Sequence, residues 1–149
     1  MMKERRQATI GGERRSFASL ARTAIEKHVP EARIATAWWS LGTNSLWIRW
    51  AFGGGYAYLG LHRHLDWLSG EVGVSREPVE MGALYALPGV PALTVPGYRI
   101  RLGHLLESGD RWWPAGDTEG ELIERLEWLV LQLHVKGTAY FRRYPEGQR

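Results

Sequence analysis

Hydrophobic and polar residues alternate most clearly between Ser45 and Phe52, and this alternation predicts a β-strand. One side of that strand is hydrophobic and holds Leu46, Ile48 and Trp50. The opposite side holds Trp47, Arg49 and Ala51. Turn-forming residues precede and follow the strand, so residues 33–40 and 56–64 are predicted as its two hairpin neighbours.

A helix is predicted near each end of the chain, because hydrophobic residues recur there every three to four positions. The first helix begins after Ser16, which has the side chain of an N-cap residue. It ends near His28, since Pro30 cannot continue a helix.

The second helix is predicted from Glu119 to Lys136 and is introduced by a capping box that Thr118 forms with Glu121. Gly137 is the expected C-cap. The hydrophobic stripe of this helix consists of Leu122, Ile123, Leu126, Leu129, Val130 and Leu133.

Shorter elements are predicted in the remaining segments. Residues 65–68 are expected to form a short helical turn. Residues 71–97 are rich in Gly and Pro, which predicts loops with one short strand around residues 83–87. Residues 98–102 and 138–144 are predicted as two further strands.

Together these elements predict an α+β fold. An antiparallel sheet of about four to six strands would carry the N-terminal helix and the long C-terminal helix on one face. We expect residues 16–144 to form a single domain, between a flexible basic arm over residues 1–15 and a polar tail over residues 145–149.

The charge of the chain is unevenly distributed. The formal net charge is +3, and this excess lies within residues 1–15, so the predicted domain is neutral. Nucleic-acid-binding domains usually carry their basic excess on the folded surface. Nucleic-acid binding is therefore an alternative hypothesis that depends on the arm and on aromatic side chains.

The composition also excludes several kinds of chemistry. The chain has no cysteine, which excludes a disulfide framework, a thiolate zinc site and a cysteine nucleophile. No hydrophobic run approaches the roughly 20 residues that span a bilayer, and the polar start does not resemble a secretory signal. We therefore expect a cytoplasmic protein with no membrane partner and no cofactor.

Two segments of the C-terminal half suggest a relationship to other proteins. These are Tyr98-Arg99-Ile100-Arg101-Leu102-Gly103-His104-Leu105 and Arg111-Trp112-Trp113-Pro114, followed by the long helix and Tyr140-Phe141. The chain thereby resembles an uncharacterised bacterial family of small α+β proteins of unknown function. This resemblance implies an α+β fold and no activity. Such proteins are often encoded near toxin or defence genes, which implies an inhibitor or immunity-type role.

One pattern suggests a metal site. His62, His64 and Asp66 alternate, so on a strand their side chains would project from one face. Two imidazoles and a carboxylate suit zinc or non-haem iron. A metal-dependent enzyme at His62 and His64 is therefore an alternative, although a solvent-facing polar row explains the same pattern and we assign no metal ligand.

The sequence offers no hydrolase motif. It contains neither a Gly-x-Ser-x-Gly elbow nor a His-Glu-x-x-His metalloprotease motif, and no catalytic residue is assigned. Glu121, Glu124 and Glu127 are predicted to lie on a solvated helix face, with Glu121 paired to Arg125. Trp112 and Trp113 are predicted to be packing anchors.

The face of the sheet that the helices leave open is the predicted binding site. It should carry Trp47, Arg49, Tyr56, Tyr58, His62, His64, Arg99 and Arg101. Trp, Tyr and Arg dominate binding hot spots, because each combines a large contact area with a directed polar group. Residues 71–97 or a second subunit could instead cover this face.

The pattern as a whole favours a non-enzymatic interaction domain. It would bind a protein partner through the aromatic and Arg-rich face, and the simplest partner is a second copy of the same chain. Catalysis by dispersed residues stays open at this point.

Overall fold

The computed structural model describes residues 16–34, 37–40, 42–79 and 99–143 of the chain. The predicted arm, the predicted tail and the strand predicted around residues 83–87 lie outside these residues. The elements follow in the order α1 (Phe17–His28), η1 (Pro30–Arg33), β1 (Ala37–Ser40), β2 (Ser45–Phe52), β3 (Gly55–His64), β4 (Trp67–Ser75), β5 (Arg99–Arg101), α2 (Leu102–Leu105), β6 (Trp113–Pro114) and α3 (Glu119–Arg143).

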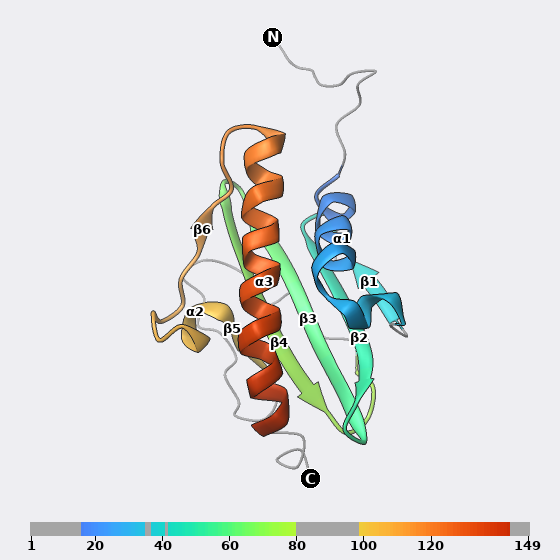
Figure 1. The fold of residues 1–149 in the computed structure, drawn as a ribbon. Helices are drawn as coiled ribbons and strands as arrows, with labels where there is room; N and C mark the ends of the chain where they lie inside the picture. Colours follow the sequence, from blue (N-terminus) through green and yellow to red (C-terminus); the bar gives the residue numbers. More distant parts are fainter. Residues whose placement is uncertain (1–15, 35–36, 41, 80–98, 144–149) are drawn as a thin grey trace.

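The strands form one six-stranded antiparallel sheet in the order β1-β2-β3-β4-β5. The two-residue strand β6 also pairs with β4, next to its first two residues. Helices α1 and α3 lie side by side on one face of this sheet (Figure 1). The predicted α+β class, with both helices on one face, is confirmed.

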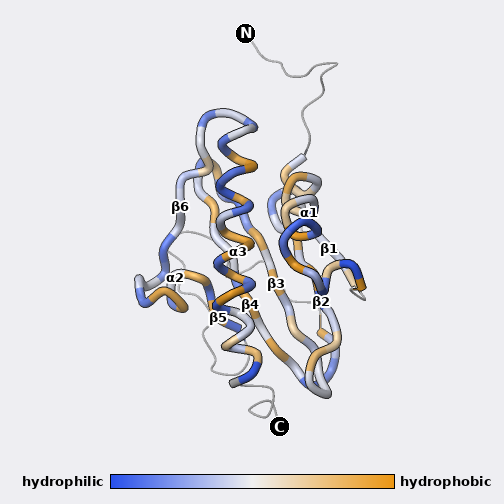
Figure 2. The backbone as a smooth tube through the Cα atoms, viewed as in Figure 1, coloured by the Kyte–Doolittle hydropathy of each residue, from blue (hydrophilic) through white to orange (hydrophobic). Residues whose placement is uncertain are grey.

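Both helices bury the hydrophobic stripes that the sequence predicted. Ser16 caps α1, since its Oγ accepts a hydrogen bond from the backbone N–H of Ser19. Hydrophobic positions recur along α3 where it lies over the sheet (Figure 2). They pack with Leu46, Ile48 and Trp50 of β2 in a single core. No helix within the described segments is long and apolar enough to cross a membrane.

Strand β2 has the predicted bounds, and its hairpin with β3 is also confirmed. Ser45 lies opposite His62, and Phe52 lies opposite Gly55. Gly53 and Gly54 form the connecting turn with φ values of 58° and 83°, a backbone conformation that glycine adopts without steric cost.

The strand predicted over residues 33–40 is shorter than expected. Pro30–Arg33 form a 3₁₀-helix, and β1 covers Ala37–Ser40. Proline favours the first position of a helical turn because its φ is fixed and it has no N–H to leave unpaired. Alternation of hydrophobic and polar residues does not reveal this preference of proline, so the strand was predicted too long.

The helical turn predicted at residues 65–68 is wrong, and so is the loop predicted to begin at residue 71. Strand β4 pairs with almost the whole of β3. Gly70 weakens the strand pattern in the sequence, because glycine is uncommon inside strands. In the structure this glycine lies beneath α3. A Cβ on this residue would lie 2.5 Å from Leu133 Cδ1, so glycine at this position leaves room for the close packing of α3 on β4.

The C-terminal boundary of the long helix was also predicted wrongly. Helix α3 continues through Gly137 to Arg143, where the sequence predicted an edge strand. A Cβ on Gly137 would lie 3.0 Å from Val72 Cγ1 of β4. Gly137 therefore allows close packing on the sheet and does not end the helix. Tyr140 and Phe141 extend the buried stripe by one turn.

Candidate functional site

The predicted orientation of the side chains on the sheet is confirmed. Trp47 lies opposite Gly60, and Arg49 lies opposite Tyr58. Trp47 and Tyr58 form a cluster separate from the main core, on the face turned away from α1 and α3. The guanidinium of Arg99 lies over the Trp47 ring on this same face.

The prediction that this face is exposed is wrong for most of its residues. The exposed fraction is 0% for Trp47 and Tyr58, 1% for His62 and Arg101, and 4% for Arg99. Arg49, Tyr56 and His64 are partly buried. Trp47, Tyr58, His62, Arg99 and Arg101 therefore do not form an exposed contact surface in this structure.

The chain itself folds back over part of this face after β4. The backbone N–H of Val79 donates to Tyr58 Oη at 2.9 Å, and Arg49 Nη1 donates to the Val79 carbonyl at 3.2 Å. Tyr58 Oη also lies 2.7 Å from Ser75 Oγ. Residues 76–79 therefore cover part of this face. Of the segment 71–97 that was named as an alternative cover, residues 71–75 belong to β4 and residues 80–97 lie outside the described residues.

Four polar side chains form a buried hydrogen-bonded chain across this face. Ser45 Oγ lies 2.9 Å from His62 Nδ1, and His62 Nε2 lies 2.7 Å from Glu71 Oε2. Arg99 Nε donates to Glu71 Oε1 at 2.7 Å. Each residue comes from a different one of four neighbouring strands, β2 to β5. We call this set the polar chain.

Electrostatic interactions keep Glu71, in the middle of the polar chain, in its ionised form. Burial raises the pKa of Glu71, but hydrogen bonds and charge interactions with His62 and Arg99 outweigh that effect and lower the pKa to about 2. Glu71 is therefore a carboxylate and accepts from both neighbours. With Nε2 donating to the Glu71 carboxylate, the imidazole of His62 connects Glu71 to the Ser45 hydroxyl.

A hydroxyl, an imidazole and a carboxylate in this order also occur in enzymes with an activated serine. Ser45, however, is only 5% exposed, and its hydroxyl lies within the sheet. We therefore interpret the polar chain as a structural network that joins four strands. Sequence reasoning missed both Ser45 and Glu71. Ser45 lies opposite His62 in the predicted β2–β3 hairpin, whereas Glu71 reaches His62 only through the β3–β4 pairing, which was not predicted.

The arginines of this face are not available to a phosphate group. Arg99 is paired with Glu71, and Arg101 Nη1 donates to both carboxylate oxygens of Asp110 at 2.8 Å. The Arg101 guanidinium also lies 5.4 Å from the ring centroid of Trp112. Trp112 is 9% exposed, which agrees with its predicted role as a packing anchor.

The predicted His62/His64 metal site is not formed. Both ring nitrogens of His62 are already hydrogen-bonded, and Asp66 lies in the turn after β3. Within the part of the chain that the structure describes, no group of three or more His, Cys, Asp or Glu side chains is placed to hold a metal ion.

Acidic residues of α3 have more specific roles than the predicted solvated face. Glu127 lies 3.1 Å from His28 Nε2 and accepts from Lys27 Nζ, and these hydrogen bonds lower the pKa of Glu127. The predicted pair between Glu121 and Arg125 is wrong. Glu121 caps the helix start, whereas the Arg125 guanidinium donates to the Pro114 carbonyl.

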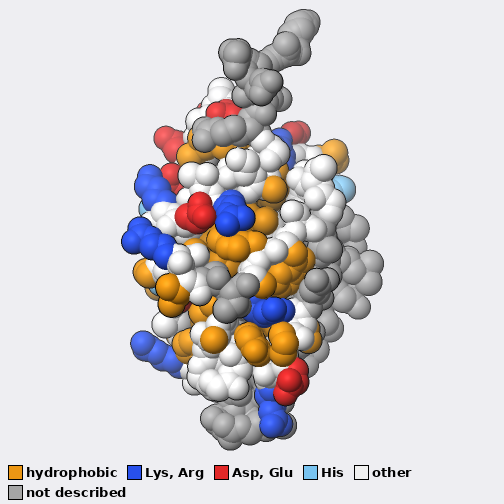
Figure 3. All heavy atoms as spheres, turned by 90° about the vertical axis from the view of Figure 1, so that its right-hand side faces the viewer, with side chains coloured by type: hydrophobic (Ala, Val, Ile, Leu, Met, Phe, Trp, Pro, Cys, Tyr) orange, Lys and Arg blue, Asp and Glu red, His pale blue; other side chains and the backbone are white. Residues whose placement is uncertain are grey.

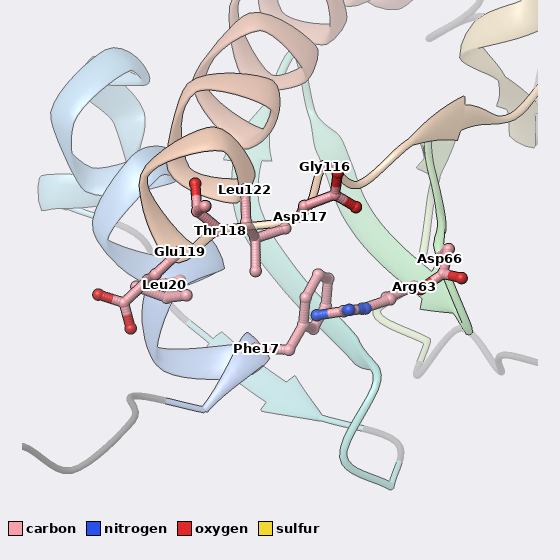
Figure 4. Close-up of a pocket in the computed structure, with 9 residues that line it drawn as sticks. All are labelled: Phe17, Leu20, Arg63, Asp66, Gly116, Asp117, Thr118, Glu119 and Leu122. Carbon is pink, nitrogen blue, oxygen red and sulfur yellow. The ribbon is translucent and has the colours of Figure 1, made fainter. Parts of the chain in front are cut away.

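A hollow of about 310 Å³ lies between the start of α1, the β3–β4 turn and the start of α3 (Figure 4). Its charged lining consists of Arg63 together with three carboxylates, those of Asp66, Asp117 and Glu119. Arg63 already donates to the Leu65 carbonyl. The lining is negative overall, which disfavours a phosphate or carboxylate ligand.

The edge of the sheet at β1 carries hydrophobic side chains. Figure 3 shows this side of the molecule, where hydrophobic groups gather beside α1 and β1. The two tryptophans of β1, Trp38 and Trp39, already pack against other side chains of the chain. Arg22 lies 4.2 Å from the Trp38 ring centroid, and Trp39 stacks on Trp47 at 6.2 Å.

The outer side of α3 is different, because its large hydrophobic side chains face solvent. Trp128 is 41% exposed, Leu131 is 42% exposed and Val135 is 64% exposed. We call these three residues the outer stripe. Trp113 packs against Trp128 with ring centroids 5.4 Å apart, and the two rings border a hollow of about 280 Å³.

No family model, no curated protein and no solved structure matches this chain. The resemblance to an uncharacterised bacterial family therefore stays a prediction.

Proposed function

We propose that the protein is a non-enzymatic interaction domain that binds a protein partner through the outer stripe of α3. The observation that carries this proposal is the exposure of Trp128, Leu131 and Val135 along one line of a well-packed helix. Exposed hydrophobic patches on a folded domain mark interaction sites more often than isolated exposed residues do.

The burial of the polar chain supports the same conclusion. The polar chain pairs its own hydroxyl, imidazole, carboxylate and guanidinium groups, and these side chains are buried. A tryptophan at the centre of an exposed patch provides a large and rigid contact area, which is typical of a binding hot spot.

The proposal is tested with the double substitution Trp128→Ser and Leu131→Ser on the immobilised full chain. The matched control is Ile34→Ser, which removes a hydrophobic side chain that is 79% exposed and lies outside α3. We expect proteins of the source cell to be retained by the wild type and the control and lost from the double variant. Each protein retained in this way is then purified and titrated against the three chains.

Equal retention by all three chains, or equal affinity of the purified protein for them, would contradict the proposal. Circular dichroism checks that each variant is folded before the comparison is made.

A further inference from the structure

The geometry of α3 points to a second copy of this chain as the partner, bound antiparallel along the outer stripe. This inference rests on the proposed function, because it names the partner of the same surface. It also differs from the earlier expectation of a dimer formed over the open sheet face, most of whose predicted residues are buried.

The residues along the outer side of α3 are arranged by charge. At 100° per residue, seven exposed positions of α3 lie within an arc of about 80°, whereas the exposed residues Glu119, Gly120 and Lys136 lie outside it. In chain order the seven positions are Glu121, Glu124, Trp128, Leu131, Val135, Ala139 and Arg142. The line therefore starts with two carboxylates, continues with hydrophobic side chains and ends with a guanidinium.

An antiparallel second copy matches this arrangement. A two-fold axis between Leu131 and Gln132 lies near the midpoint of α3, so the two helices would overlap along almost their whole length. Along the paired helices, Trp128 would then face Val135 of the second copy, and Glu121 would face Arg142 of the second copy. A parallel pair would instead bring like charges together at both ends, which is unfavourable.

The hollow beside Trp128 fits the same arrangement. It is bordered by Trp113, Glu124, Arg125 and Trp128, and its volume of about 280 Å³ exceeds that of a valine side chain. Val135 of the second copy would lie opposite Trp128 and could enter this hollow. A tryptophan pocket that receives an aliphatic side chain is a common form of interface core.

The rest of α3 leaves the outer stripe accessible. The flank toward α1 is already engaged, since Glu127 binds Lys27 and His134 lies 3.0 Å from Glu31. The sheet-facing stripe is buried. A second helix can therefore approach α3 from the side away from α1 and the sheet, where the outer stripe lies.

Sedimentation equilibrium of the full chain tests whether the dimer exists. We expect a reversible dimer for the wild type and for Ile34→Ser, and a monomer for the double variant Trp128→Ser and Leu131→Ser. A wild type that stays monomeric at all concentrations overturns the inference. If that monomer still binds another protein through the outer stripe, the proposed function stands; if it binds none, both fail.

Charge reversal tests the antiparallel direction. Arg142→Glu places a carboxylate opposite Glu121 of the second copy, and we expect the dimer dissociation constant to rise roughly tenfold. Adding Glu121→Lys to that variant should restore the dimer. The control Arg33→Glu makes the same change of charge on η1 and should have no effect. An Arg142→Glu variant that dimerises like the wild type overturns the antiparallel arrangement.

Cysteine cross-linking gives an independent test, because the chain has no cysteine of its own. In the antiparallel dimer, position 124 faces position 139 of the second copy. A mixture of Glu124→Cys and Ala139→Cys chains should form mixed disulfides, whereas either chain alone should not. Efficient cross-linking of Glu124→Cys alone would show a parallel pair and overturn the inference.

Discussion

The guanidinium of Arg99 lies 5.3 Å from the ring centroid of Trp47, while its Nε donates to Glu71. A buried arginine is thus held between an aromatic ring and a carboxylate, which together compensate for its lost hydration. Trp47 in turn lies against Gly60 of β3. The face of the sheet opposite the helices is therefore a packed polar and aromatic layer with its own internal pairing.

Substitution of Glu71 tests the central role of this carboxylate. Glu71→Gln removes the negative charge beside the buried Arg99 guanidinium, so we expect the free energy of unfolding to fall by about 3–5 kcal/mol. Urea denaturation at pH 7 measures this change. The control Glu107→Gln removes an exposed carboxylate and should change the free energy of unfolding by less than about 0.5 kcal/mol.

The low pKa of Glu71 also predicts a pH dependence. The pKa is about 2 in the folded protein and 4.5 in the reference state, so its ionisation stabilises the fold fully above pH 4.5. That contribution is lost as the pH falls from about 4.5 to about 2. The stability difference between wild type and Glu71→Gln should shrink by about 2 kcal/mol between pH 5 and pH 3. A difference that stays constant over this range would contradict the prediction.

Even a small side chain at position 60 should destabilise the protein. A Cβ at this position would lie 2.8 Å from three ring atoms of Trp47, so Gly60→Ala should destabilise the protein by about 1–3 kcal/mol. Gly120 provides the control, because its Cβ would meet only Thr118 Oγ1 at 3.9 Å. Gly120→Ala should be neutral or stabilise by up to about 1 kcal/mol, since alanine favours the helix. Thermal unfolding of both variants makes the comparison.

The last turn of α3 is expected to be essential to the core. Phe141 is 3% exposed and packs against Trp50 and Phe52, with ring centroids 5.7 and 5.5 Å apart. Phe141→Ala should lower the free energy of unfolding by about 3–5 kcal/mol. The neighbouring exposed residue Lys136 serves as the control, and a Phe141→Ala variant as stable as Lys136→Ala would refute the helical packing of this turn.

The structural interpretation of the polar chain predicts an inert serine. Because Ser45 is buried, a fluorophosphonate probe should not label the folded protein. Mass spectrometry of the treated chain detects the expected adduct. Labelling at Ser45 that disappears in His62→Gln would instead identify an activated nucleophile and contradict our interpretation.

The elements that could be predicted from the sequence are those whose signal is local. Strand β2 alternates without interruption, and Ser16 and Thr118 are N-caps that act within one helical turn. Strand β4 could not be predicted in this way. Its glycines at positions 70 and 73 resemble loop residues until the approach of α3 explains Gly70.

The candidate site depends still more on tertiary structure. Alternation places Trp47 and Arg99 on one face, but it cannot show what covers that face. Glu71 joins the polar chain only because β4 pairs with β3, and that pairing was not predicted. The outer stripe was equally hidden, since Trp128 and Leu131 resemble additional core positions until the burial of the other stripe is known.

The contact between α1 and α3 has a consequence for how the protein is made. Lys27 and Glu127 bind each other across 100 residues of sequence. While the ribosome is still translating the middle of the chain, hairpins β2–β3 and β3–β4 can already form, because their contacts are local. The hydrophobic face of these hairpins then stays exposed until α3 has been synthesised and can cover it. Nascent chains halted before residue 119 should therefore be chaperone clients, whereas those that have released residue 143 should escape.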